Sequence, residues 1–143
     1  MTSGPFVSAS RIDRKGNLMP STAEVTTLLE KYCAAMSGRD RETWLSCFTD
    51  DAVQEDPVGT PANIGREAIA KFYDENVTDL TLSVMAPPIV IGNEVLAFLR
   101  VDIVMDGQQM ELPRIVDHIV LDESGTKFKS LRAFFDYAEI RPV

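Results

Sequence analysis

Three side chains in the sequence stand out as groups that could hold or move a proton: Tyr32, Asp56 and Asp117. Asp117 lies in a run of strand-like residues, where alternate side chains face opposite sides, and its side also holds Ile115 and Ile119. An ionised carboxylate in apolar surroundings is unfavourable by several kcal/mol unless it is paired. We therefore expect Asp117 to be protonated, paired or in water; the simplest alternative is an edge-strand aspartate that points to solvent.

The other candidate residues each have a plain structural interpretation as well. Asp56 precedes a proline, and an Asp-Pro pair most often only opens a turn. Tyr32 and Tyr73 lie on the apolar sides of two predicted helices, where a buried phenol needs a hydrogen-bond partner but is commonly a core residue. Phe135 is predicted to line the interior, because it shares a strand face with Leu131 and Ala133.

Other chemistries are poorly supported by the sequence. The single histidine, His118, has the strand parity opposite to Asp117, so we expect it at the surface or at a subunit contact. One histidine without a nearby nucleophile makes a covalent triad improbable. Cys33 and Cys47 lack the spacing of a zinc site and are predicted to be reduced core residues. No metal is expected.

The composition limits the remaining classes. The chain has 143 residues, 45% of them hydrophobic and 25% charged, with a mean hydropathy of −0.04, which is typical of one globular domain. No apolar run reaches the roughly 20 residues of a membrane helix, and no signal peptide is evident, so we expect a soluble cytoplasmic protein. The net charge of −8 would repel a phosphate backbone, which makes nucleic acid an unlikely partner.

The pattern of residues indicates a single α+β domain over residues 19–143, after a flexible N-terminal extension at 1–18; Met19 is a possible alternative start. A capping box at Ser21 opens the first helix, which ends near Gly38. The second helix is capped by Asp40, carries Trp44, Leu45 and Phe48, and closes at 49–51; the third covers 65–77.

Strands are predicted from residue 79 onward, where the period of the apolar residues changes from 3.6 to 2, and one brief strand is predicted earlier, after the second helix. Their ranges are 52–55, 80–85, 94–105, 110–121 and 128–137. A type I′ turn at Asp106-Gly107 and short connections predict antiparallel pairing, with three helices covering one face of a curved sheet. Residues 86–88 are predicted to form a loop that affects specificity at the far end of a cavity.

The order of these residues resembles that of bacterial ketosteroid isomerase. The resemblance runs from about residue 21 to residue 135 and rests on Tyr32, the segments 51–59 and 65–73, and Asp117. It implies the cone-shaped α+β fold of the nuclear transport factor 2-like superfamily. It also implies a steroid Δ-isomerase that needs no metal or organic cofactor and usually works as a homodimer packed through the sheet.

The same resemblance implies roles for individual residues. Asp56 corresponds to the general base that takes a proton from C4 of a Δ5-3-ketosteroid and returns it to C6. Tyr32 and a protonated Asp117 correspond to the oxyanion hole for the 3-oxygen. Tyr73 corresponds to the phenol that supports Tyr32, and Phe135 to an aromatic wall beside the steroid.

A departure from the family pattern concerns Phe48, which stands where some members have a third tyrosine. The hydrogen-bond chain behind Tyr32 would then end at Tyr73.

Other functions on the same fold remain open at this stage. An enzyme similar to limonene epoxide hydrolase would use an Asp-Arg-Asp relay, but Arg114 lies three residues before Asp117 and thus faces the other side, unless Pro113 sits at a bulge. A polyketide-cyclase-like enzyme would also need a base in the cavity. A third alternative is a non-catalytic protein that binds steroids or other apolar ligands.

Overall fold

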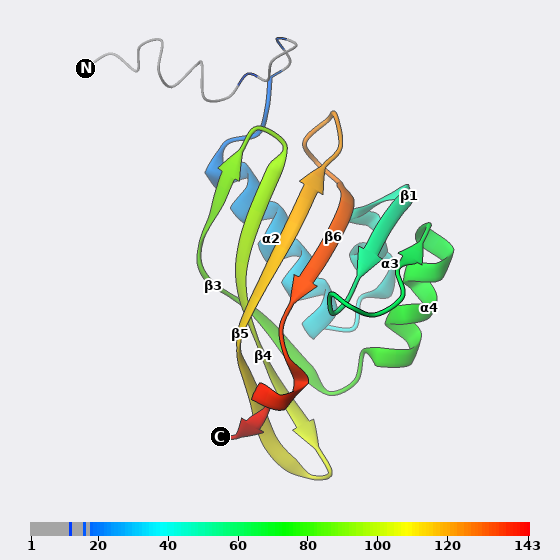
Figure 1. Cartoon of the computed structure of the whole chain (residues 1–143), viewed down its shortest axis with the longest axis vertical. Coiled ribbons are helices and arrows are strands. Elements are labelled where there is room, and N and C mark those ends of the chain that lie inside the picture. Colours follow the sequence, from blue (N-terminus) through cyan, green and yellow to red (C-terminus); the bar gives the residue numbers. More distant parts are fainter. Residues whose placement is uncertain (1–11, 13–15, 17) are drawn as a thin grey trace, which may run out of the picture.

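The structure is a computed structural model, and it describes residues 12, 16 and 18–143. The predicted extension at 1–18 lies almost entirely outside the described residues. Seven strands form one sheet in the order β2-β1-β6-β5-β4-β3, and β7 pairs with β5. The labelled helices lie on one side of this sheet (Figure 1), so no labelled helix covers its other face. This arrangement confirms the predicted α+β class.

The helices begin where their capping residues predict. Helix α2 (Thr22–Ser37) opens with the predicted capping box, in which Ser21 and Glu24 exchange side-chain and backbone hydrogen bonds. Helix α3 (Arg41–Ser46) is capped by Asp40, whose carboxylate accepts a hydrogen bond from the Thr43 amide at 3.2 Å. Helix α4 (Arg66–Asn76) follows Gly65, which has a φ of 89°.

The predicted second helix is too long by several residues. It ends at Ser46, and Phe48 is the first residue of strand β1 (Phe48–Glu55). Phe48 pairs with Phe128, and the Phe128 amide donates a hydrogen bond to the Cys47 carbonyl at 2.7 Å. This long-range strand pairing overrides the local helical pattern, because it completes the hydrogen bonds of a fully buried segment.

The central strands are antiparallel, as predicted. They are β3 (Leu80–Ile91), β4 (Glu94–Met105), β5 (Gln108–Leu121) and β6 (Phe128–Phe134). Positive φ angles of 51° and 76° at Asp106 and Gly107 confirm the type I′ turn between β4 and β5. The predicted loop at 86–88 is instead part of β3, where two prolines are tolerated because β3 is an edge strand.

The sheet is mixed rather than purely antiparallel. Strand β1 runs parallel to β6, and the short β2 (Asn63–Ile64) completes that edge. Strand β6 ends at Phe134, three residues earlier than predicted. The chain then forms a short 3-10 helix, η1 (Tyr137–Glu139), and returns to β5 as β7 (Arg141–Pro142).

A bulge in β5 changes the predicted sides of its residues. Leu99 of β4 lies opposite Ile115, whereas Val101 lies opposite Leu112, so β5 holds one extra residue between these pairs. Simple alternation places Leu112 on the side opposite Ile115, and this prediction is wrong: both are buried on the inner face. Beyond the bulge the alternation holds, and Asp117 and Ile119 face inward as predicted.

Two smaller predictions are confirmed. Cys33 and Cys47 are free and buried. His118 lies on the outer face of the sheet, where its Nε2 is 2.8 Å from a carboxylate oxygen of Glu94. In the part of the chain that the structure describes, no helix has the length and apolar character needed to cross a membrane.

Candidate active site

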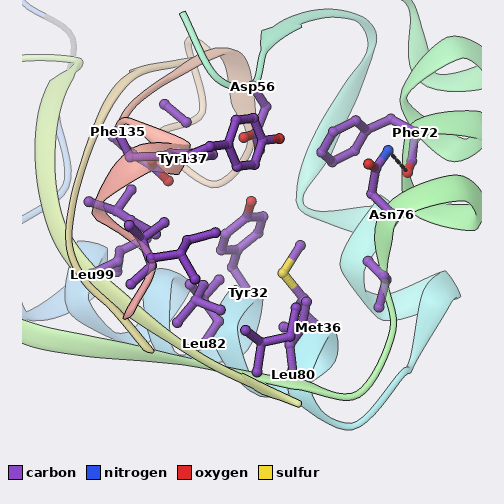
Figure 2. Close-up of a pocket in the computed structure, with 18 residues that line it drawn as sticks. Tyr32, Met36, Asp56, Phe72, Asn76, Leu80, Leu82, Leu99, Phe135 and Tyr137 are labelled. Atoms are coloured by element: carbon purple, nitrogen blue, oxygen red, sulfur yellow. Dashed lines mark hydrogen bonds between the residues drawn. The ribbon is translucent and has the colours of Figure 1, made fainter. Parts of the chain in front are cut away.

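A deep, mainly apolar cavity lies between the helices and the inner face of the sheet. It encloses about 870 Å³, its open mouth included, and its walls include Leu82, Leu99 and Leu112. Four of the six predicted site residues line it together, and Figure 2 labels three of these, Tyr32, Asp56 and Phe135. These four are Tyr32, Asp56, Asp117 and Phe135.

The sheet itself sets the separation of the two carboxyl groups. Asp117 on β5 lies opposite Ala133 on β6. On the other side of β6, Glu55 at the end of β1 pairs with Arg132, and Asp56 follows directly in the chain. Two strand spacings therefore separate Asp117 from the end of β1, a distance of about 10 Å.

Asp117 is a buried carboxyl group with an unsatisfied atom. Its exposed fraction is 3%, and its Oδ1 has no hydrogen-bond partner among the described residues. Burial raises the pKa of Asp117 well above its ordinary value, and the charge of Asp56 raises it further. Of the three states expected from the sequence, these effects favour the protonated one, in which Asp117 can donate a hydrogen bond.

Asp56 has a different environment at the end of β1. Its side chain is half-buried, and no group among the described residues donates a hydrogen bond to its carboxylate. Burial raises the pKa of Asp56 to about 7. Burial thus favours the protonated form of Asp117, whereas a pKa of about 7 leaves Asp56 partly ionised at neutral pH.

Tyr32 presents a neutral phenol to the cavity. Its ring packs against Trp44 and edge-on against Phe128, with centroids 5.8 Å and 5.2 Å away. Figure 2 shows the Tyr32 hydroxyl pointing into the cavity, toward Asp56. Burial, followed by the charges of Asp117 and Asp56, raises the pKa of Tyr32 well above its usual value, which favours the protonated form.

Tyr73 and Phe48 do not line the cavity. The Tyr73 hydroxyl is buried without a hydrogen-bond partner among the described residues. Trp44 contacts both Tyr32 and Tyr73, with ring centroids 5.8 Å and 5.0 Å away, and so takes the place of the hydrogen bond that the resemblance implies. Phe48 packs edge-on against Tyr32 at 6.1 Å. The support of Tyr32 is therefore aromatic packing.

Two polar cavity residues received no role from the sequence, Tyr137 and Asn76. Tyr137 shares the predicted inner parity of Phe135, and Asn76 lies on the predicted inner side of the third helix. Their positions were therefore predictable, but no motif distinguishes them from ordinary surface residues.

The arginine relay of an epoxide hydrolase is not assembled here. The bulge that would permit it lies between Leu112 and Ile115, but Arg114 faces solvent with 77% of its side chain exposed and pairs with Glu139 at 3.1 Å. No arginine, lysine or histidine occurs among the described residues that line the cavity. No group of three or more potential metal ligands occurs in the described part of the chain.

Comparison with known proteins places this geometry in a family. Residues 29–127 match the SnoaL-like domain. The chain belongs to the SnoaL-like family. A steroid Δ-isomerase from Nocardioides simplex is 29% identical over 115 residues, which cover 80% of this chain and 91% of that protein. This similarity supports the superfamily that the sequence resemblance implied.

A solved structure confirms the fold. SalBIII, described as an epoxide hydrolase/cyclase-like enzyme in pyran ring formation in the polyether salinomycin, superposes with a TM-score of 0.75. It is 23% identical, and the match covers 85% of this chain and 97% of that chain. SnoaL-like domains therefore keep this nuclear transport factor 2-like fold while their relatives carry out different reactions.

The buried Asp117 predicts a particular dependence of stability on pH. A carboxyl group with a raised folded-state pKa stabilises the fold at pH values below its ordinary pKa, and that contribution is lost as pH rises toward the folded-state value. Asp117 and Asp56 should together make the free energy of unfolding fall as pH rises from 4 to 8. Each group lowers it by about 1.4 kcal/mol per pH unit between its unfolded-state and its folded-state pKa.

Asp117→Asn should therefore flatten this decline and raise stability at pH 8 relative to the wild type. Urea unfolding at four pH values measures the effect. Asp106→Asn, in the exposed β4–β5 turn, is the control and should follow the wild type. Parallel curves for Asp117→Asn and the wild type would show that Asp117 has an ordinary pKa.

Proposed function

We propose that the chain is a steroid Δ-isomerase that converts Δ5-3-ketosteroids to Δ4-3-ketosteroids. The observation that carries this proposal is the pairing of two neutral donors, Tyr32 and Asp117, with a separate carboxylate, Asp56, in one apolar cavity. Abstraction of a proton next to a ketone needs both parts, a base at carbon and donors at oxygen.

The proposed reaction moves one proton and leaves the composition of the steroid unchanged. The Asp56 carboxylate takes a proton from C4, and the electron pair of that C–H bond delocalises onto the 3-oxygen as a dienolate. Tyr32 and Asp117 donate hydrogen bonds to this oxygen, each worth about 3 to 4 kcal/mol in a water-excluded site. Asp56 then returns the proton to C6, and the double bond becomes conjugated with the ketone.

The electrostatics of the cavity suit these roles. A base is most effective when its pKa lies near the working pH, and burial brings the pKa of Asp56 to about 7. The donors must keep their protons at that pH, and the raised pKa values of Tyr32 and Asp117 favour this. The apolar walls complement the hydrocarbon skeleton of a steroid.

The similarity to the Nocardioides simplex isomerase supports this reaction over the alternatives. An epoxide hydrolase relay would activate water through an arginine, but Arg114 faces solvent and no arginine occurs among the described residues that line the cavity. A polyketide cyclase needs a base but gives no reason for two donors beside it. A non-catalytic binder would likewise have no need for an unpaired, buried Asp117.

We also propose that two copies of the chain associate through the uncovered face of the sheet. One row across that face consists of Phe98, Val116 and Phe134, which are neighbours on β4, β5 and β6. Phe134 is 43% exposed, and Leu96 in the adjacent row is 37% exposed. An apolar row of this kind is typical of a surface that pairs with another protein.

The base assignment predicts the effect of Asp56→Asn. An amide cannot accept the C4 proton, so kcat should fall by roughly 10² to 10⁴-fold while steroid binding is retained. The assay follows the ultraviolet absorbance that appears as 5-androstene-3,17-dione becomes conjugated. Asp106→Asn is the matched control. A wild-type protein that binds the steroid without this absorbance change would favour the non-catalytic alternative.

The oxyanion donors predict a ligand preference. Equilenin presents a phenolic oxygen where the dienolate oxygen would lie, so it should bind more tightly than a saturated 3-hydroxysteroid of similar size. Tyr32→Phe removes one donor and should reduce this preference by roughly 1 to 3 kcal/mol. Calorimetric titration of both ligands against both proteins measures it. An undiminished preference in Tyr32→Phe would exclude Tyr32 as a donor.

The proposed dimer predicts the mass of the particle in solution. Wild-type protein should sediment at roughly twice the chain mass of 15.8 kDa, and Phe134→Asp should sediment as a monomer, because it places a charge in the apolar row. Ile64→Asp changes another exposed apolar residue, 72% exposed at the far edge of the sheet, and should leave the dimer intact. A monomeric wild type would contradict the proposal.

A further inference from the structure

The chain beyond β6 brings Tyr137 to the cavity that holds the proposed base. Tyr137 opens the 3-10 helix η1 and lines the same cavity as Asp56. In Figure 2 the Tyr137 ring overlaps the Asp56 side chain in the view, and its hydroxyl points toward Phe72. The two groups are close enough that the charge of Asp56 contributes, after burial, to a raised pKa of the Tyr137 phenol.

The turn that carries Tyr137 is fixed at both ends. The Asp136 carboxylate accepts a hydrogen bond from the Ala138 amide at 2.9 Å and caps η1. Two residues after Tyr137, Glu139 pairs with Arg114 at 3.1 Å. Beyond η1, strand β7 pairs with β5. The position of the Tyr137 ring is therefore set by the fold rather than by a free chain end.

The Tyr137 ring forms the outermost layer of the cavity wall. It packs edge-on against Phe135, with centroids 5.1 Å apart and ring planes at 89°. Tyr137 is 59% exposed and Asp56 is less exposed, so the ring lies nearer to the solvent than the carboxylate does. Removing this ring would open the carboxylate of Asp56 to water.

Few other groups can set the protonation of Asp56. Helix α2 contributes Tyr32 and β5 contributes Asp117, both of which hold their protons at neutral pH. From α4 the cavity receives only the uncharged Phe72 and Asn76.

On the neighbouring residues of β1 and β6, the charges of Glu55 and Arg132 are paired with each other at 3.1 Å. No hydrogen bond from a described residue holds the Asp56 carboxylate either. Exposure to water is therefore the main influence on the pKa of Asp56.

We propose that Tyr137 is a positioning residue of this site, whose ring excludes water from Asp56 and thereby makes the carboxylate a stronger base. The inference rests on the proposed function for its chemical meaning, because an isomerase needs a base of near-neutral pKa. The ring, not the hydroxyl, is responsible, since no hydrogen bond joins Tyr137 and Asp56 in the described structure.

The test measures the pKa of Asp56 directly in the ligand-free protein. Carboxyl carbon NMR between pH 4 and pH 9 follows its titration, with the signal assigned by its loss in Asp56→Asn. Tyr137→Ala should lower this pKa by at least about one unit from about 7, because the carboxylate becomes hydrated. Tyr137→Phe is the matched control: it keeps the ring, and the pKa should stay near 7.

The same variants have a kinetic readout that a merely structural role would not change. In Tyr137→Ala the acid limb of the kcat/KM profile should move to lower pH with the pKa, whereas in Tyr137→Phe it should stay in place. Should Tyr137→Ala not fold, Tyr137→Ser provides a second removal of the ring. The thermal unfolding midpoint of each variant checks its folding.

The outcomes separate the two proposals. If steroid is not isomerised but the Asp56 pKa still falls in Tyr137→Ala, the proposed function fails and the effect of the ring stands. If isomerisation occurs and the Asp56 pKa is unchanged in Tyr137→Ala, this inference is wrong. An equal fall in Tyr137→Phe and Tyr137→Ala would assign the effect to the hydroxyl and also overturn it.

Discussion

A buried carboxylic acid, with one oxygen that has no hydrogen-bond partner among the described residues, is the constraint on which this site depends. Asp117 faces inward between Ile115 and Ile119 and can remain there only in its neutral form. In its neutral form it can donate a hydrogen bond to a group bound in the mainly apolar cavity that it lines. The nearby Asp56 reinforces this state, because two close carboxyl groups of like charge disfavour double ionisation.

Local signals in the sequence predicted much of the fold. The capping box at Ser21 and the turn at Asp106-Gly107 each specify backbone geometry within a few residues, and both appear in the structure. Asp117 was predictable for a similar reason, since alternation along one strand compares it with its immediate neighbours. That Tyr32 and Asp56 line the same cavity as Asp117 could be predicted only from the resemblance, because no local pattern connects these three separate segments of the chain.

The remaining differences come from long-range contacts. Phe48 fits the apolar stripe of a helix, and only its pairing with Phe128 makes it part of a strand. The bulge in β5 shifts Leu112 to the inner face, although Pro113 and Arg114 give no unique signal for it. The hydrogen bond between Tyr32 and Tyr73 that the resemblance implies is absent, because Trp44 packs against both rings.

Strand β6 has Asp117 of β5 on one side, opposite Ala133, and on its other side the end of β1, which Asp56 follows directly in the chain. The sheet thus sets the spacing between the strand that carries Asp117 and the strand end that precedes Asp56, because neighbouring hydrogen-bonded strands lie at a fixed interval. This interval is a property of the peptide backbone and is the same for every sequence that forms the sheet. Changes in α4 or in the C-terminal turn can therefore reshape the mouth for a different ligand without altering that separation.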